Sequence, residues 1–218
     1  MSYTIVIAKY NENMDWLVKM DQQHICIYNK GTCTLKNENV KNRENIGREA
    51  ETYLYHIIEN YNNLPDYLIL IQGNPFDHMK NITPDTFQNK INEKIKNVHD
   101  IEGLFSDYIS ESHYKYPGIK TKEYYNFLFG ENTLPPESVF SPGCQYIIPR
   151  ENILSRPLEF YKNFHYMTLH NTFTTANEAH FNDIPFDHMS IHPWCVERLF
   201  RYIFIKNIPS SIQMLQKR

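Results

Sequence analysis

The stretch Tyr67-Leu68-Ile69-Leu70-Ile71-Gln72-Gly73-Asn74-Pro75-Phe76-Asp77-His78 decides the fold class of this chain. Its first half is a short, continuous apolar run, which is typical of a strand covered on both faces. Its second half changes to polar side chains with Gly and Pro, which end the strand and begin a turn. A buried strand of this kind belongs to the centre of a sheet, and its polar end is expected at an edge where ligands bind.

Strands and helices alternate before this stretch. Residues 3–8 and 24–28 are strand-like runs, and the segment between them predicts a short helix that carries Met14, Leu17 and Val18. Alternation of this type implies parallel strands joined by right-handed crossovers. The loops that begin near Tyr10 and Gln72, and the loop near Asn29, are therefore expected to meet at one edge of the sheet.

The clearest helix begins after Asn45. Its apolar residues recur at spacings of three and four, which predicts a buried stripe of Ala50, Tyr53, Leu54, Ile57, Ile58 and Tyr61. Glu49, Glu51, Thr52 and His56 are expected outside the stripe.

The second half of the chain is less regular. It predicts a surface helix over 84–96, short elements at best over 99–142, a strand over 143–148, and helices over 157–164 and 194–204. At 218 residues the chain is long enough for one well-cored domain. The fold class expected is therefore α/β: a single domain over 1–218 with a mostly parallel central sheet, flanking helices and an irregular C-terminal half.

Composition narrows the partners and the compartment. A net charge of -3 and a pI near 6.4 argue against a general nucleic-acid binder, which usually carries a basic surplus. No apolar run approaches the roughly 20 residues that cross a bilayer, so no membrane span is expected. Four scattered cysteines without a CxxC motif, and no signal peptide, favour a reducing compartment such as the cytoplasm.

The polar strand end at Gln72 is the first candidate site. Asp77 can offer a carboxylate to a hard cation such as Mg²⁺ or Mn²⁺, and the amides of Gln72 and Asn74 can hold a ligand hydroxyl or phosphate. The alternative is a plain turn in which Asp77 caps the next segment.

The start of the clear helix, Asn45-Ile46-Gly47-Arg48-Glu49, is the second candidate. A helix N-terminus offers free N–H groups and the positive end of a dipole to a phosphate, and Arg48 adds a forked donor. Neither GxGxxG nor GxxxxGK[ST] occurs in the chain. The alternative is an ordinary helix start with Arg48 paired to a surface acid.

The third candidate lies near the C-terminus and comprises His180, Asp183, Asp187, His188, His192 and Cys195. Two histidines four apart can bind zinc from one helix face, but Pro185 and Pro193 interrupt that helix. The alternative is a set of loop histidines, of which His192 adds a ligand to a metal held by Asp77. Glu197, at the head of the last helix, can act as a general base or pair with Arg198 or Lys206.

Four stretches carry a family resemblance: Ile5-Val6-Ile7-Ala8-Lys9-Tyr10-Asn11-Glu12 with Trp16-Leu17; Tyr28-Asn29-Lys30-Gly31; Asn45-Ile46-Gly47-Arg48-Glu49-Ala50 with Tyr53-Leu54; and Gln72 to His78. They resemble a family of small domains of unknown function from fungi and large DNA viruses. The resemblance continues through Gly143-Cys144-Gln145-Tyr146, Arg156-Pro157 with Phe160-Tyr161, and Glu197-Arg198-Leu199-Phe200. Viral members of this pattern are similar to nucleotide-sugar glycosyltransferases with the GT-A fold.

That resemblance implies a nucleotide-binding half over 1–80 and an acceptor-side half over 81–218, in a protein of the host cytoplasm if viral. It implies a UDP- or GDP-linked sugar as donor and a glycan or other hydroxyl as acceptor. Carried over by residue, Ala8, Tyr10 and Asn11 contact the base or ribose, Asn29 and Lys30 lie near the nucleotide, Arg48 lies near the diphosphate, and Gln72 and Asn74 stand at the strand end.

The resemblance further implies a Mn²⁺ or Mg²⁺ ion at Asp77, to which His192 is expected to add a ligand, and a general base among Asp183, Asp187 and Glu197. The GT-A fold usually holds its metal on an Asp-x-Asp motif, which this sequence lacks. Two alternatives stay open. One is a metal-dependent hydrolase or phosphotransferase built on Asp77 and the histidine cluster, and the other is a non-catalytic protein that binds nucleotides or sugars.

Overall fold

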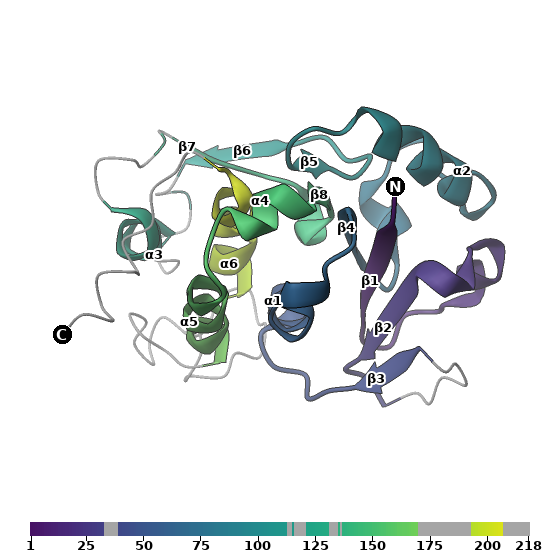
Figure 1. Ribbon diagram of the computed structural model, residues 1–218, viewed down its shortest axis with the longest axis horizontal. Coiled ribbons are helices and arrows are strands. Elements are labelled where there is room, and N and C mark those ends of the chain that lie inside the picture. Colours follow the sequence, from purple (N-terminus) through teal and green to yellow (C-terminus); the bar gives the residue numbers. More distant parts are fainter. Residues whose placement is uncertain are drawn as a thin grey trace.

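A six-stranded sheet forms the centre of the molecule in the computed structural model, which describes residues 1–32, 39–112, 115, 121–130, 135, 137–169 and 193–206 (Figure 1). The strand order is β3-β2-β1-β4-β8-β5. The strands are β1 (Tyr3–Lys9), β2 (Ile25–Asn29), β3 (Val40–Asn42), β4 (Tyr67–Gln72), β5 (Glu102–Gly103) and β8 (Tyr146–Pro149). The pairs β1–β2, β1–β4 and β2–β3 are parallel, whereas β8 is antiparallel to both of its neighbours. The predicted mixed α/β class with a mostly parallel sheet is confirmed.

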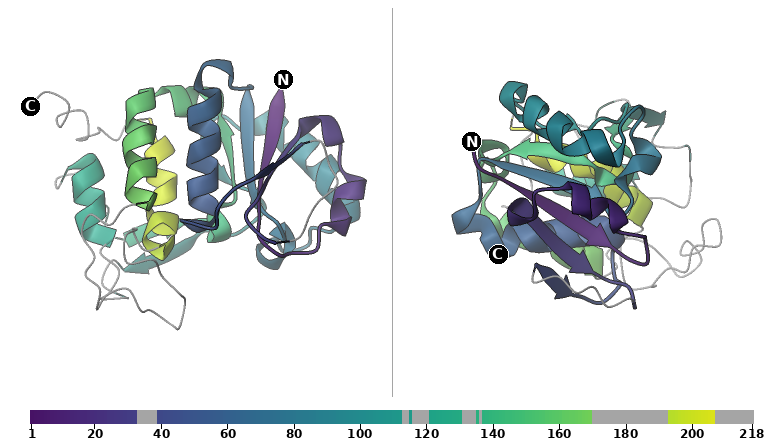
Figure 2. Two further views of the ribbon diagram at one scale, coloured as in Figure 1. Left: turned by 90° about the horizontal axis from the view of Figure 1, so that it is seen from below. Right: turned by 90° about the vertical axis from the view of Figure 1, so that its right-hand side faces the viewer.

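Both faces of the sheet are covered, which explains its apolar strands. Alternate residues of one strand enter different cores: Val6 and Ala8 pack on one face, whereas Ile5 and Ile7 pack on the other. One face carries α1 (Arg48–Asn60), α5 (Leu158–Leu169) and α6 (Pro193–Phe200), and the other carries α2 (Pro84–Lys94) with η1 (Asp15–Lys19) and η2 (Gln22–His24) (Figure 2).

Helix α1 confirms the predicted stripe but is buried more widely than expected. Ala50, Tyr53, Leu54 and Ile57 are buried, as their spacing predicts. Glu51, Thr52 and His56, which were expected outside the stripe, are buried as well. The reason is tertiary: α5 packs along α1, and the hydroxyl of Tyr28 on β2 lies 3.0 Å from His56 Nδ1.

Two segments differ from the sequence-based expectation. The helix expected around residues 14–18 is the short 3-10 segment η1, in which Trp16 and Leu17 are buried and Val18 is 80% exposed. The region 99–142 contains a full helix, α3 (Thr121–Phe129), whose buried face includes Tyr124 and Leu128. It also contains β6 (Ile109–Ser112) and β7 (Glu137–Phe140), which form a separate antiparallel pair.

The remaining elements are short. The predicted strand over 143–148 begins only at Tyr146, because Pro142–Cys144 forms the 3-10 turn η7. The others are α4 (Arg150–Leu154), η3 (Tyr61–Asn63), η4 (Pro75–His78), η5 (Ile95–Asn97) and η9 (Arg201–Phe204). Among the described residues, no helix is both long and apolar enough to cross a membrane.

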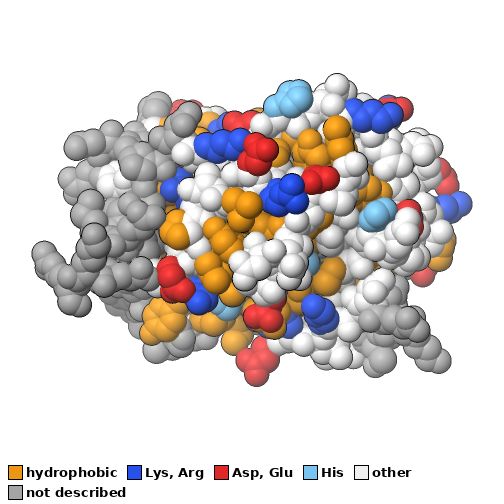
Figure 3. Space-filling view, in the orientation of Figure 1, with side chains coloured by type: hydrophobic (Ala, Val, Ile, Leu, Met, Phe, Trp, Pro, Cys, Tyr) orange, Lys and Arg blue, Asp and Glu red, His pale blue; other side chains and the backbone are white. Residues whose placement is uncertain are grey.

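Charges of both signs are interspersed on the face shown in Figure 3, where blue and red side chains alternate around apolar ones. This distribution agrees with the small net charge of -3.

Candidate functional site

A pocket of about 270 Å³ opens at the carboxyl ends of β1 and β4. The chain leaves β1 toward β2 and β3 on one side and returns through α1 to β4 on the other side. The loops that follow β1 and β4 therefore diverge, and an open α/β sheet binds ligands in the crevice that such loops leave. The residues that line the pocket are Ala8, Lys9, Tyr10, Glu12, Lys30, Asn45, Arg48, Glu49 and Gln72.

Five of the residues expected to hold a nucleotide sugar line this pocket: Ala8, Tyr10, Lys30, Arg48 and Gln72. Ala8 and Gln72 are register partners at the ends of β1 and β4, so their convergence follows directly from the parallel pairing. Tyr10 extends from the end of β1 and is 47% exposed.

Three other residues expected there do not line the pocket. Asn29 donates from Nδ2 to Asn42 Oδ1 at 3.0 Å and so joins the ends of β2 and β3. Asn11 accepts a 3.3 Å hydrogen bond from the backbone N–H of Thr32, which joins the loops after β1 and β2. Asn74 donates to Asp77 Oδ1 at 2.8 Å. All three shape loops near the pocket.

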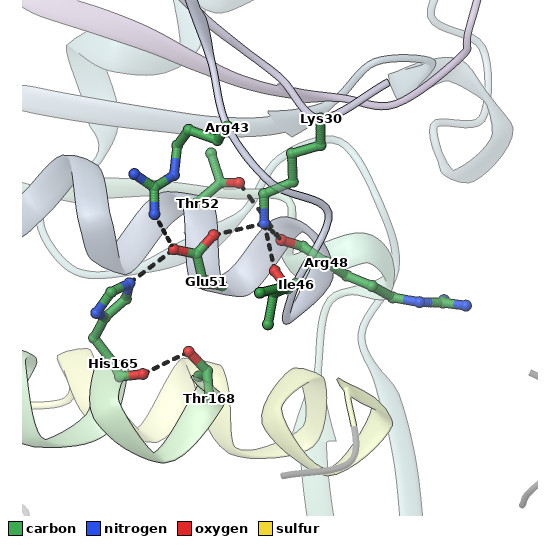
Figure 4. A network of polar contacts seen from close by, with 8 residues as sticks. All are labelled: Lys30, Arg43, Ile46, Arg48, Glu51, Thr52, His165 and Thr168. Carbon is green, nitrogen blue, oxygen red and sulfur yellow. Dashed lines mark hydrogen bonds and ion pairs between the residues drawn. The ribbon is translucent and has the colours of Figure 1, made fainter. Parts of the chain in front are cut away.

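Arg48 presents an uncompensated charge on the pocket wall. Its side chain extends away from the neighbouring polar network (Figure 4), and within the described part of the chain its guanidinium makes no hydrogen bond or ion pair. The surface ion pair allowed for by the sequence is therefore not formed among the described residues. Arg48 also begins α1, so its charge lies beside the positive end of the helix dipole.

Lys30 differs from the expectation that it faces the nucleotide. Its Nζ donates to the carbonyl oxygens of Ile46 and Arg48, both at 2.6 Å, and to Glu51 Oε2 at 2.5 Å. An ammonium has three donors, and all three are therefore engaged inside the protein. Lys30 contributes to the pocket wall and holds the start of α1, but it has no hydrogen left for a phosphate.

Glu51 is the centre of this buried network (Figure 4). Besides Lys30, its carboxylate contacts Arg43 at 2.5 Å and His165 Nε2 at 2.7 Å. Burial by itself would raise the pKa of Glu51, but the hydrogen bonds from His165 and Lys30 and the charges of Lys30 and Arg43 outweigh it and lower the pKa to about 2. Glu51 is thus ionised at every physiological pH.

Four pocket residues had no individual role in the sequence-based prediction, although Asn45 and Glu49 lie in the second candidate segment: Lys9, Glu12, Asn45 and Glu49. Lys9 is buried, and its Nζ donates to the carbonyl of Tyr10 at 2.6 Å. Glu12 accepts from the backbone N–H of Tyr10 at 2.6 Å and lies against Gly73, where a Cβ would come within 2.6 Å of its carboxylate. All four lie inside the resemblance motifs. In the sequence Glu49, for example, looks like an ordinary acid in the first turn of a helix, so nothing distinguishes it as a pocket residue.

Glu197 on α6 lies just beyond the pocket wall. Its Oε1 accepts a 2.6 Å hydrogen bond from the backbone N–H of Gly143. Gly143 also contacts Gln72, because a Cβ at this glycine would lie 2.6 Å from the Gln72 carboxamide. Burial and the charge of the pocket residue Glu49 raise the pKa of Glu197 to about 7, although its side chain is still 17% exposed.

The alternative partners of Glu197 are largely engaged elsewhere. Arg198 forms a long ion pair with it, at 3.8 Å, and also donates to Glu111 from Nε at 2.8 Å. Lys206 pairs with Glu151 at 3.4 Å. The other candidate bases, Asp183 and Asp187, lie outside the described residues, as do His180, His188 and His192.

Asp77 does not line the pocket. It is exposed in η4 and accepts a side-chain hydrogen bond from Asn74 within that turn. The turn itself is held by Trp16 Nε1, which donates to the Gly73 carbonyl at 2.9 Å, and by Gln145 Nε2, which donates to the Pro75 carbonyl at 3.1 Å. Among the described residues, no group of three or more His, Cys, Asp or Glu is placed to hold a metal ion. The metal site expected at Asp77 with His192 stays a prediction, because His192 lies outside the described residues.

The comparisons with known proteins identify the family but give no activity. The chain belongs to the family DUF3431, described as a protein of unknown function, whose model matches residues 5–117. No curated protein and no solved structure matches the chain significantly. The matched region includes every residue that lines the pocket, whereas Glu197 lies beyond it.

Proposed function

We propose that this member of the DUF3431 family is a glycosyltransferase with a variant of the GT-A fold. It binds a UDP- or GDP-linked sugar in the pocket and transfers the sugar to a hydroxyl of a glycan or other acceptor. One observation carries the proposal. The pocket at the carboxyl ends of β1 and β4 has on its wall the cation Arg48, which pairs with no acid among the described residues, and just beyond it the carboxyl group of Glu197, with a pKa of about 7.

The nucleotide end of the donor is assigned to Tyr10 and Arg48. The half-exposed ring of Tyr10 offers a surface on which a base can stack. The guanidinium of Arg48 and the N-terminus of α1 supply positive charge and N–H donors for the diphosphate. The cavity of about 270 Å³ is near the lower end of the roughly 300–1,000 Å³ of small-molecule sites, so part of the donor would extend beyond it.

The remaining pocket side chains suit the hydroxyl groups of a sugar. Glu12 and Glu49 are carboxylates that accept hydrogen bonds, and Asn45 and Gln72 are amides that both donate and accept. A polyhydroxylated ligand requires this mixture of acceptors and donors.

Glu197 is assigned as the general base. It would take the proton of the acceptor hydroxyl as the acceptor oxygen forms a bond to C1 of the sugar. The bond between C1 and the diphosphate oxygen breaks in the same step, and Arg48 stabilises the charge that develops on the diphosphate. A carboxyl group with a pKa near 7 suits this role, because a base works best when its pKa lies near the working pH.

The expected metal at Asp77 and His192 receives no step here, because His192 lies outside the described residues and Asp77 does not line the pocket. Leaving-group stabilisation is therefore assigned to the chain's own cation, Arg48. The test below is run with and without Mn²⁺, and the comparison determines whether donor binding also requires a metal ion.

A thermal-shift panel of UDP, GDP and their sugars, with and without Mn²⁺, tests this proposal. We expect one nucleotide series to raise the melting temperature of the wild type, and Arg48→Ala to weaken its affinity roughly tenfold or more, because charge-assisted hydrogen bonds contribute about 1.5–3 kcal/mol. Lys80→Ala is the matched control, because Lys80 is 83% exposed and pairs with Asp107 away from the pocket. The proposal fails if no nucleotide shifts the melting temperature or if Arg48→Ala binds as well as the wild type.

Turnover separates transfer from binding alone. Release of nucleoside diphosphate that depends on an added acceptor supports a transferase. Acceptor-independent release indicates hydrolysis of the donor, and tight binding without release indicates a binding protein.

A further inference from the structure

The backbone at the start of α1 has an unfavourable conformation at the residue proposed to bind the diphosphate. Gly47 and Arg48 are consecutive residues in the left-handed region, with φ of 63° and 51°. Glycine adopts this region freely, but a long side chain such as that of arginine rarely does. Residues with such backbone angles cluster at binding and catalytic sites, and surrounding contacts must hold them there.

Lys30 supplies those contacts. The carbonyl groups of Ile46 and Arg48 stand on either side of Gly47, and Lys30 Nζ donates to both at 2.6 Å. Its third hydrogen bond goes to Glu51, one turn further along α1. In Figure 4 the ammonium of Lys30 lies inside this turn, and the Arg48 side chain leaves the turn in another direction.

Glu51 anchors the turn to the rest of the fold. Its carboxylate is joined by Arg43, from the segment after β3, and by His165, from α5. The turn also leaves no room for a side chain at Gly47, because a Cβ there would lie 2.7 Å from Glu51 Cβ and 3.3 Å from the Thr168 carbonyl. Lys30 and Glu51 are themselves almost fully buried, with side chains 3% and 1% exposed.

We propose that Lys30 and Glu51 are positioning residues, which hold the guanidinium of Arg48 on the pocket wall and act on an anionic ligand only through Arg48. This inference rests on the proposed binding of a diphosphate. The simpler interpretation is a buried ion pair that only stabilises the fold. Desolvation largely offsets the attraction within such pairs, and all three Lys30 donors converge on one strained turn, so the pair serves conformation more than stability.

A double-mutant cycle between Lys30 and Arg48 tests this inference, with affinity for inorganic pyrophosphate, UDP and GDP measured by titration calorimetry. We expect Lys30→Met to weaken binding roughly tenfold in the wild type and less than about twofold in the Arg48→Ala background, because residues that act through one another are not additive. Lys94→Met is the matched control. It removes a partly buried lysine of α2, which pairs with Glu102 at 2.8 Å and contacts neither Glu51 nor the Ile46 and Arg48 carbonyls, so affinity is expected to stay within about twofold.

Equal losses in the two backgrounds, or no loss for Lys30→Met, would overturn the inference while leaving the role of Arg48 intact. If Lys30→Met does not fold, the double variant Lys30→Met/Glu51→Met replaces it, because an apolar pair of similar size often preserves stability.

Hydrogen exchange over residues 44–52 gives a readout without a ligand. Faster exchange in Lys30→Met than in Lys94→Met supports the inference, and equal exchange overturns it. If the wild type binds none of the probes, the proposed function fails, and exchange alone then decides the role of Lys30.

Discussion

Glu197 shows how its position in the fold changes the chemistry of a common residue. Its carboxyl group is mostly buried beside Gly143 and within electrostatic range of Glu49, and both burial and that charge disfavour ionisation. Glu51 has the opposite environment, since three donors surround it and favour ionisation. The pKa values of the two glutamates are therefore shifted in opposite directions from the usual 4.5, to about 7 for Glu197 and to about 2 for Glu51.

The first consequence concerns activity. If Glu197 is the base, the transfer rate should rise with pH and level off above about 7, where its carboxylate is formed. Glu197→Gln cannot accept the proton and should lower kcat roughly a hundredfold or more, with a smaller effect on donor affinity. The measurement is kcat against pH for both proteins. A rate that is independent of pH between 5 and 8, or an active Glu197→Gln variant, would contradict the assignment.

The pH dependence of stability gives an independent check, because the direction of the change follows from the direction of each pKa shift. Because the folded-state pKa of Glu197 is raised from 4.5 to about 7, its contribution is fully present below 4.5 and is lost as the pH rises through 7. Glu197→Gln should therefore gain stability relative to the wild type as the pH rises from 4.5 to 8. For Glu51, whose pKa is lowered to about 2, the contribution is present above 4.5 and is lost as the pH falls toward 2. Urea titrations across this range, with Glu51→Gln as the second variant, separate the two effects.

At the scale of elements, the loops after β1 and β2 are locked together by a close approach. A Cβ on Gly31 would overlap the carbonyl oxygen of Tyr10 and press on the side chain of Asn11. Because the obstacle is backbone, neither loop can yield without moving the pocket wall at Tyr10.

We therefore expect Gly31→Ala to destabilise the protein by about 2 kcal/mol or more, as overpacked sites do, and to reduce nucleotide binding. Gly130→Ala is the control, because its Cβ would meet nothing within 4 Å and the change costs only about 1 kcal/mol for its positive φ. Thermal and urea unfolding of both variants measure the difference. A Gly31→Ala protein as stable as Gly130→Ala would contradict the close approach of these loops.

Helix α1 shows which features of an element the sequence pattern predicts and which it does not. Its apolar stripe follows from a period of 3.6 residues, which is a local property of the chain. The burial of Glu51 and His56 does not follow from the period. It depends on Tyr28 from β2, Lys30 just after β2, Arg43 from the segment after β3, and α5, all brought to the helix by tertiary packing.

At the scale of the molecule, two cores share one sheet. Leu70 belongs to the core on the α1 face and Ile69 to the core on the α2 face, and neither side chain is exposed. Since every long strand contributes to both cores, loss of one face removes the support of the other. The expected single domain over 1–218 therefore predicts one cooperative unfolding transition.

The two tryptophans allow this to be tested. Trp16 packs in the α2-face core, and Trp194 packs against the α1-face core. In single-tryptophan proteins made with Trp194→Phe or Trp16→Phe, Leu70→Ala and Ile69→Ala should each cost about 2–5 kcal/mol and shift both fluorescence midpoints together. Midpoints that separate by face would indicate two independently stable units.

The sequence by itself determined the strands β1, β2 and β4, the helix α1 and the edge of the sheet where a site would form. These features depend on periodicity, on turn residues and on the geometry of parallel pairing, all of which are local or general. It also pointed to Tyr10, Arg48 and Gln72, because these residues lie at or next to the predicted strand ends and the predicted helix start.

Only the tertiary structure decided how each charge is used. Lys30 and Arg48 are alike in the sequence, yet Lys30 is fully bonded to Glu51 and two carbonyls, whereas Arg48 on the pocket wall has no ion-pair partner in the described part of the chain. Asp77 and Glu197 are both acids near an element end, yet Asp77 turns to solvent while Glu197 is buried beside Gly143. The free energy of a charge depends on its partners and its exposure to water, and the folded chain brings those partners from distant positions.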